Sequence, residues 1–509
     1  MIHTKLLVQL VAAVLLPLSH AAPNPHSKRA SSDVPDVTLD NGLVIQGTSS
    51  ALTPNVKQYL GIPYAQPPLD DLRFAPPQAY DAVSGTVING TTLPPSCMQY
   101  ITKLDTMVTV DVPQFEIGAA GMSEDCLTTS VFAPVDAEGL PVLIWVFGGG
   151  FVTGGTDVPY QMPEQWVELS QSHIVVSMNY RVNIFGYPNA AGLDDQNVGF
   201  LDQRLAVQWV QQNIAKFGGD PARMVLWGQS AGAMSVDVYN YAWASDPIVT
   251  GYIMDSGTTH LDILKSVDTT HSNFSSVARN LGCANQTDAA AELACMRSVT
   301  AEAIEEFLEI YQDGGVTPTV NFFPIVDEKT LFSNYTEKAL NGEISDVPAI
   351  ITFNANEGVF LLPYDVNGPD QATADYISYS SFWCPATVAT NERLSAGLTT
   401  YRLFYTGNFT NTSPAFWMGA SHGSELPLIF GTHANFRGNS TAFEWSVSEA
   451  LQAAYLAFVT DPQSGLAGVD WPAYEGAGGS VRIFAENETA VQIGTVADIE
   501  AGCAQLGLL

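Results

Sequence analysis

The chain has 509 residues, of which 46% are hydrophobic and 14% are charged, and its formal net charge is −33. A charge this negative excludes nucleic acids and anionic membrane surfaces as main partners, because both would repel the protein. The apolar content is ample for a large core, and large α/β enzymes often exceed the usual domain length as one unit. We interpret the charge as a solubility feature of a secreted protein.

The N-terminal segment has the composition of a secretory signal. Lys5 precedes a mostly apolar run over 6–18, and Ser19-His20-Ala21 forms a small-x-small cleavage pattern. We predict a signal peptide over 1–21, a short pro-segment over 22–29 that ends in the dibasic pair Lys28-Arg29, and a single domain over 30–509. Since the apolar run is shorter than a membrane span of about 18 residues, we expect no transmembrane segment and a secreted, extracellular protein.

The cysteines and sequons agree with this compartment. An oxidising environment favours disulfides, and zinc is disfavoured because the sequence has no C-x-x-C pair. We therefore predict neither a metal nor a cofactor. The six cysteines are Cys97, Cys126, Cys283, Cys295, Cys384 and Cys503. We expect several, not all, of the N-x-S/T sequons to carry a glycan. These sequons begin at Asn89, Asn273, Asn285, Asn334, Asn408, Asn411, Asn439 and Asn487.

The predicted elements alternate between strands and helices along the chain, which is typical of a mostly parallel sheet covered on both faces. Breaks in composition near 260–320 and 360–420 indicate insertions at the carboxyl edge of that sheet. In chain order we predict strands or strand-bearing stretches at 141–147, 173–181, 224–227, 251–257 and 347–358, and helices at 201–217, around 289–296 and around 446–458.

Two stretches match the G-x-S-x-G pattern of serine esterases, at 228–232 and at 419–423. A nucleophile elbow needs a buried strand before the serine and a helix after it. Ser230 meets this requirement, since an apolar run precedes it and small residues follow. Ser421 does not, because a proline at 414 precedes it and Pro427 follows it closely. We predict that Ser230 is the nucleophile.

The elbow belongs to a wider set of motifs along the chain, which are LGIPYAQPPLDDLRF, SEDCL, GGGF, NYRVNIFGY, NVGFLDQRLAVQWVQQNI, FGGDP, GQSAG, NEG and HGSE. Together these motifs resemble the type-B carboxylesterase/lipase family, an α/β-hydrolase group. The resemblance runs from about residue 35 to the C-terminal cysteine. It implies an α/β-hydrolase fold, with a large, mostly parallel central sheet flanked by helices and insertions at the carboxyl edge.

The resemblance implies a complete catalytic machinery, because the chain order in this fold is nucleophile, acid and histidine. The family motif places the base at His422, with His433 as the alternative. The acid falls on Glu357, with Asp255 as a rival by position. Ser256 would support the site by hydrogen bonding. Backbone N–H groups of the predicted oxyanion hole belong to Gly149, Gly150 and Ala231.

The same resemblance implies structural pairings that the residues alone leave open, since six cysteines allow 15 connectivities. The implied disulfides are Cys97–Cys126, Cys283–Cys295 and Cys384–Cys503, and the implied buried ion pairs are Arg73–Glu124 and Arg181–Asp220.

Two features of the sequence bear on the substrate. They are the departures from the family pattern and the apolar residues that could line the acyl pocket. Gln229 stands where many relatives carry Glu, which removes a negative charge beside the nucleophile. The loop from 97 to 126 has polar and proline interruptions, so we expect a serine carboxylic ester hydrolase for short to medium acyl or small-molecule esters. Candidates for the acyl pocket are Phe151, Phe322 and Phe323.

Two alternatives remain: a triacylglycerol or sterol-ester lipase, and a non-catalytic adhesion or binding homologue. Such homologues typically lose a position of the catalytic triad, and all three are present here. We expect a small-molecule ester as the partner.

Overall fold

The computed structural model describes residues 34–261, 268–284 and 288–509. The predicted signal peptide, the pro-segment and the sequon at Asn285 lie outside these ranges. Within them, no helix is both long and apolar enough to cross a membrane.

An eleven-stranded sheet forms the centre of the molecule, in the order β16-β15-β14-β13-β12-β11-β9-β10-β8-β4-β3. The block from β10 to β15 is parallel, and the strands beyond it at each end pair antiparallel. Its strands are β3 (Thr48–Ser50), β4 (Thr53–Pro63), β8 (Thr128–Pro134), β9 (Leu140–Val146), β10 (Ile174–Met178), β11 (Gly219–Gln229), β12 (Gly251–Asp255), β13 (Ala349–Asn354), β14 (Thr400–Tyr405), β15 (Ser480–Glu486) and β16 (Thr489–Thr495). Two small sheets contain β1 (Val37–Thr38), β2 (Val44–Ile45) and β5 (Val87–Ile88), and β6 (Ser96–Cys97) and β7 (Met122–Ser123).

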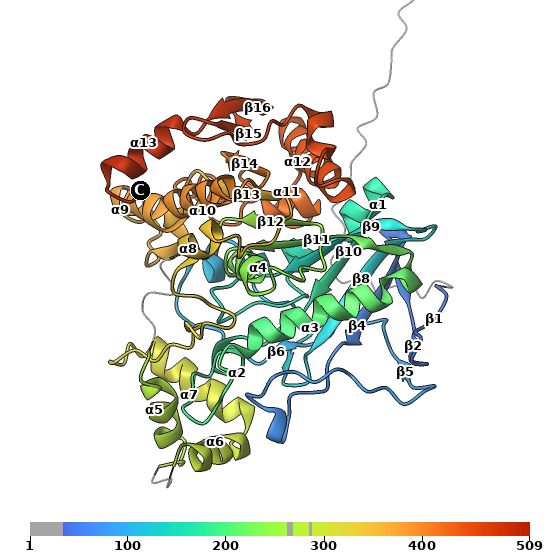
Figure 1. Ribbon diagram of the computed structural model, residues 1–509, viewed down its shortest axis with the longest axis vertical. Coiled ribbons are helices and arrows are strands. Elements are labelled where there is room, and N and C mark those ends of the chain that lie inside the picture. The colour runs from blue at the N-terminus through green and yellow to red at the C-terminus, as the bar shows by residue number, and fades with distance from the viewer. Residues whose placement is uncertain (1–33, 262–267, 285–287) are drawn as a thin grey trace, which may run out of the picture.

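Helices cover both faces of this sheet (Figure 1). The α-helices of the described residues are α1 (Glu164–Ser170), α2 (Asn183–Gly186), α3 (Val198–Asn213), α4 (Ala231–Ala242), α5 (Ser272–Asn280), α6 (Ala289–Ser298), α7 (Ala301–Asp313), α8 (Tyr335–Leu340), α9 (Gln371–Ile377), α10 (Cys384–Ser395), α11 (Leu426–Phe430), α12 (Ala442–Thr460) and α13 (Ala497–Gln505).

The core lies between the sheet and these helices, and the predicted α/β architecture is confirmed. Strands such as β9 and β10 are buried along almost their whole length, because both of their faces are covered. On one face, Trp227 packs against Phe430 of α11 and Tyr455 of α12, with ring centroids 4.8 and 5.7 Å away. Helices α3 and α4 lie on the opposite face (Figure 1).

The predicted insertion near 260–320 forms a protrusion of α5, α6 and α7 at the lower end of Figure 1. It has its own apolar cluster, which includes Phe74, Phe185 and Phe274. Phe322 is buried in this cluster, and so it does not serve the acyl pocket for which it was predicted.

The three implied disulfides are all formed, with sequence separations of 29, 12 and 119 residues. Arg73 pairs with Glu124 at 2.6 Å, as the resemblance implied. The Arg181–Asp220 prediction is wrong. The Arg181 guanidinium donates to Asp202 of α3 at 2.7 and 2.8 Å, and Asp220 instead pairs with Arg223, three residues away.

The sequon at Asn411 differs from the other sequons that the structure describes, because its asparagine is buried. The Asn411 amide nitrogen donates to the carbonyl of His433 and to the hydroxyl of Ser440, each at 2.9 Å. A glycan would replace one of the amide hydrogens that make these bonds. The structure argues against a glycan at Asn411, and glycosylation of the other sequons stays a prediction.

Glu305 of α7 should make the stability of the protein depend on pH. Burial raises the pKa of Glu305 to about 8, and the backbone of Tyr100 offsets this only in part. In the unfolded chain a glutamate titrates near pH ~4.3. The folded state therefore retains a proton that the unfolded state has lost. The stability contribution is complete below the unfolded pKa and is lost as the pH rises towards about 8.

We predict that Glu305→Gln leaves stability unchanged near pH 4 and stabilises the protein relative to wild type at pH about 8. Urea midpoints of the two proteins, measured across this range, check the prediction. Curves that run parallel at all pH values would contradict it.

Candidate active site

Ser230 lies in a sharp turn between β11, which ends at Gln229, and α4, which begins at Ala231. Its backbone has φ 57° and ψ −124°, a strained conformation for a non-glycine residue. Both flanking glycines are required by close packing. A Cβ on Gly228 would lie 2.3 Å from the carbonyl of Gly232, and one on Gly232 would lie 2.1 Å from the carbonyl oxygen of Val146. The pattern at 228–232 therefore has the geometry of a nucleophile elbow.

The second match to the pattern has a different role. Ser421 is buried, and its carbonyl accepts hydrogen bonds from the Asn354 side chain at 2.9 Å and from the Ser424 hydroxyl at 2.8 Å. The main chain at Ser421 also forms a bridge with Asn356. These contacts tie the loop that carries His422 to the end of β13.

His422 and Glu357 form a buried pair, with His422 Nδ1 and Glu357 Oε2 2.6 Å apart. The other carboxylate oxygen accepts from Ser256 Oγ at 2.6 Å and from the Asn354 N–H at 2.7 Å. Since Glu357 accepts, Nδ1 carries the proton and Nε2 is left as an acceptor. This is the tautomer that a general base needs.

The rival residues are engaged elsewhere. Asp255 accepts hydrogen bonds from Trp227, Thr352 and Tyr455, at 2.6 to 3.0 Å. Burial raises the pKa of Asp255 to about 6, although these donors act in the opposite direction. His433 Nδ1 lies 2.6 Å from the Ser440 hydroxyl and 3.1 Å from a Glu444 oxygen. Neither rival contacts the pair of His422 and Glu357 through a hydrogen bond among the described residues.

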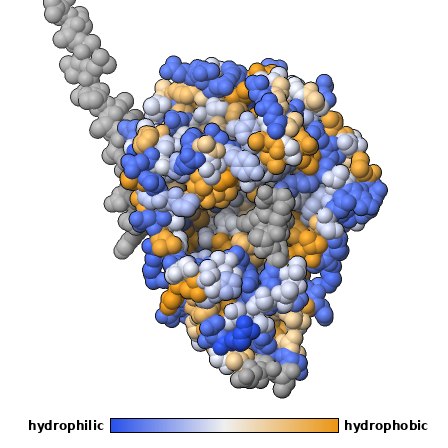
Figure 2. All heavy atoms as spheres, turned by 90° about the vertical axis from the view of Figure 1, so that its left-hand side faces the viewer, coloured by the Kyte–Doolittle hydropathy of each residue, from blue (hydrophilic) through white to orange (hydrophobic). Residues whose placement is uncertain are grey.

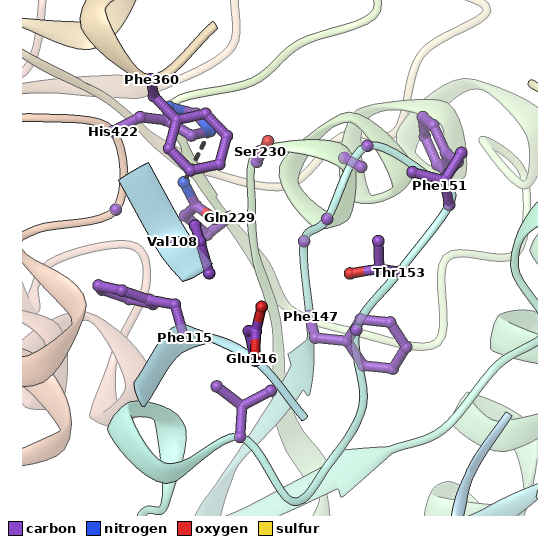
Figure 3. Close-up of a pocket in the computed structure, with 18 of the residues that line it drawn as sticks. Val108, Phe115, Glu116, Phe147, Phe151, Thr153, Gln229, Ser230, Phe360 and His422 are labelled. Atoms are coloured by element: carbon purple, nitrogen blue, oxygen red, sulfur yellow. Dashed lines mark hydrogen bonds between the residues drawn. The ribbon is translucent and has the colours of Figure 1, made fainter. Parts of the chain in front are cut away.

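The imidazole of His422 is held on both sides. Its ring lies 5.1 Å from that of Phe360 and 4.8 Å from that of Phe382, measured between centroids. Its Nε2 lies 3.1 Å from Gln229 Nε2, the contact drawn as a dashed line in Figure 3. In the described structure this nitrogen is hydrogen-bonded by Gln229 rather than by Ser230. Such catalytic contacts often tighten only when substrate binds.

The predicted oxyanion donors line the same cavity as Ser230. Gly149 and Gly150 have φ angles of 112° and 63°, which their lack of a side chain permits. Among the described residues, no acceptor is bonded to the N–H groups of Gly149, Gly150 or Ala231. Unpaired donors beside a nucleophile can stabilise a developing oxyanion.

The cavity in front of Ser230 has a volume of about 680 Å³ and a mostly apolar lining. One wall comes from the loop that the Cys97–Cys126 disulfide closes, including Val108, Phe115 and Glu116 (Figure 3). On the face shown in Figure 2 the surface is hollowed, and hydrophobic side chains gather around the hollow.

Of the three predicted pocket phenylalanines, Phe151 lines the cavity, whereas Phe322 and Phe323 do not. Phe115, Phe147, Phe360 and Phe382 also line it, although they were not predicted from the sequence. Two of them had a local signal, because Phe147 directly precedes the glycine run of the predicted oxyanion hole and Phe360 follows the predicted acid by three residues. Phe115 and Phe382 had none, since distant elements bring them to the cavity. In the part of the chain that the structure describes, no group of three or more metal-ligating side chains occurs.

Comparisons with known proteins agree with this geometry. Residues 33–375 match the family described as "Carboxylesterase family". The chain belongs to the carboxylesterase family. Its α/β-hydrolase fold and its assignment as a carboxylic ester hydrolase follow from this membership and from the relatives.

Two fungal relatives of the carboxylesterase family are each 42% identical to the chain. One is a chlorogenic acid esterase of Aspergillus niger, aligned over 90% of this chain and 92% of the relative. The other is secreted lipase 5 of Gibberella zeae, over 83% and 84%. Lipase 4 of Diutina rugosa is 30% identical, over 86% and 89%.

We predict that Ser256→Ala lowers kcat/KM for ester hydrolysis about tenfold, because a hydrogen bond to a charged group contributes about 1.5–3 kcal/mol. Its hydroxyl donates to Glu357 at 2.6 Å, so the loss acts through the orientation of His422. The matched control is Ser448→Ala, which removes a buried hydroxyl that donates to the carbonyl of Leu428. Initial rates on p-nitrophenyl butyrate test this, and equal losses in both variants would contradict it.

Proposed function

We propose that the protein is a secreted serine carboxylic ester hydrolase that acts through an acyl-enzyme on short to medium acyl or small-molecule esters. The observation that carries this proposal is the strained Ser230 beside the buried pair of His422 and Glu357. Three N–H groups, which bond no acceptor among the described residues, line the same cavity.

In the proposed reaction, His422 Nε2 takes the proton of the Ser230 hydroxyl while Oγ attacks the ester carbonyl carbon. The N–H groups of Gly149, Gly150 and Ala231 donate to the oxyanion of the tetrahedral intermediate. His422 then gives its proton to the leaving alcohol, which leaves an acyl group on Oγ. Water repeats the sequence with the same base and releases the acid. Glu357 holds the imidazole and stabilises its protonated form.

Support for small-molecule esters comes from the phenylalanine-rich cavity and from the relative named chlorogenic acid esterase. The relatives named as lipases support the alternative of a triacylglycerol or sterol-ester lipase. A further observation in favour of that alternative is a group of exposed apolar side chains on segments that line the cavity or pack beside it. They are Leu104, Val110, Leu361, Val366 and Phe416.

A non-catalytic adhesion homologue is the least supported alternative, because Ser230, Glu357 and His422 are all present, His422 is hydrogen-bonded to Glu357, and Ser230 lies in a strained turn. Secretion is supported by the predicted signal peptide, by the three disulfides and by the fungal relative named as a secreted lipase.

We predict that Ser230→Ala abolishes ester hydrolysis without loss of folding, whereas Ser421→Ala retains most of the activity. Removing a nucleophile typically costs several orders of magnitude in rate, about 10⁶-fold in the best-studied serine hydrolase. The backbone carbonyl of Ser421 anchors the loop that carries His422, and an alanine at this position keeps the same carbonyl. Initial rates together with circular dichroism of both variants provide the test. Similar losses in the two variants would show that the wrong serine has been identified.

A second prediction concerns the loop that forms one wall of the cavity. Its apolar residues Met107 and Val112 are already packed against Met418, and polar residues interrupt the rest. Opening this loop would separate these packed side chains, and the polar interruptions leave little continuous apolar surface to bind an oil interface in compensation. We expect ordinary saturation on tributyrin, a preference for short acyl chains and little response to detergent. A sharp rise in rate at the solubility limit would favour the lipase alternative.

A further inference from the structure

Gln229 contacts the predicted base directly, although neither the elbow nor the oxyanion hole requires its side chain. The residue is buried, and its Nε2 lies 3.1 Å from His422 Nε2. Because Glu357 fixes the proton on Nδ1, the Nε2 lone pair accepts this hydrogen bond from the Gln229 amide. The amide thus occupies the lone pair that must accept the proton of Ser230.

An amide at this position can serve both forms of the base. Its N–H₂ donates to neutral imidazole, and after a half-turn its oxygen accepts from imidazolium. Two glycines leave space around it. A Cβ on Gly148 would lie 2.8 Å from Gln229 Oε1, and a Cβ on Gly423 would lie 3.5 Å from Gln229 Nε2. No side chain of these two neighbours obstructs the rotation.

Carboxyl groups rather than basic side chains surround His422 among the described residues. Glu357 contacts His422 on its Nδ1 side, and behind it lie Asp255 and Glu425. Burial raises the pKa of Glu425 well above its usual range. Across the cavity is Glu116, whose pKa burial also raises. Among the described residues that line the cavity, none is Lys or Arg. Phe360 and Phe382 complete the surroundings of the ring.

A carboxylate at 229 would accept a hydrogen bond from Nε2–H and favour imidazolium, the form that cannot act as a base. The amide does not impose this bias. A carboxylate at this position would also add a further negative charge beside the base of a protein whose net charge is already −33.

We propose that Gln229 is a positioning residue, which holds neutral His422 by an N–H···Nε2 hydrogen bond and keeps the base active in acidic solution. The inference rests on the proposed function, since it assigns to His422 the role of general base. On substrate binding, the Ser230 hydroxyl replaces the amide as the donor to Nε2. When Nε2 is protonated, the rotated amide oxygen accepts from it.

The test compares Gln229→Glu and Gln229→Met with wild type, using kcat/KM for p-nitrophenyl butyrate from pH 4 to 8. We expect the acid limb of Gln229→Glu to move up by about one pH unit, because an opposite charge within hydrogen-bonding distance shifts a titration by about that much or more. Methionine has a similar shape but makes no such bond. We expect its kcat to fall roughly fivefold, with KM nearly unchanged and the acid limb moved far less than in Gln229→Glu.

A second readout does not depend on turnover. Spectra of ¹⁵N-histidine-labelled protein, with His422 assigned by the signal lost in His422→Gln, follow the titration of its ring nitrogens directly. We expect the midpoint to move upwards in Gln229→Glu. An unchanged midpoint in both readouts would overturn the role of Gln229. If esters are not hydrolysed, or if Ser230→Ala stays active, the proposed function fails, and the spectra still decide whether Gln229 governs the ionisation of His422.

Discussion

The close approach of α4 to the central sheet is the constraint on which the site depends. Gly232 lies against the carbonyl of Val146 at the end of β9, and Gly228 lies against the carbonyl of Gly232. Only residues without a Cβ allow this contact, and the contact forces Ser230 into its strained conformation. The parallel strands on both sides, buried in a large core, supply the stability that keeps the strain in place.

The buried carboxyl groups near the predicted base differ in their hydrogen-bond partners. Glu357, Asp255 and Glu425 are all fully or almost fully buried, but their partners differ. Glu357 faces the imidazole and accepts from Ser256 and a backbone N–H, whereas Asp255 accepts from three neutral side chains. Glu425 accepts from the Asn354 side chain. The proposed acid therefore differs from the structural carboxyl groups in its hydrogen-bond partners, and not in its own functional group.

The cavity is assembled from parts of the chain that lie far apart in sequence. Phe115 comes from the disulfide-closed loop, Phe147 follows β9, and Phe382 lies in η8 (Ser378–Trp383). The Cys97–Cys126 disulfide joins the two ends of that loop, so the wall that its residues form is anchored at both ends. The same loop packs against Met418 through Met107 and Val112. The lining of the cavity therefore depends on packing between insertions as well as on the ends of the strands.

Much of the architecture and of the candidate site could be predicted from the sequence. Local patterns indicated the elements and Ser230, whereas Glu357, His422 and the disulfide pairings followed from the resemblance to the family. Apolar runs and glycine stops indicated the strands and helices, and the flanking segments separated Ser230 from Ser421. The helix expected at 201–217 has different bounds in the structure. The α-helix α3 begins at Val198 and ends at Asn213, and a 3₁₀ turn continues from it to Phe217. Only the tertiary structure decided which side chains meet. It paired Arg181 with Asp202 rather than Asp220, buried Phe322 away from the cavity, and brought Gln229 to His422 across a separation of 193 residues. Local spacing fixes the direction of a side chain on its own element, whereas its distant neighbours are fixed by how the elements pack.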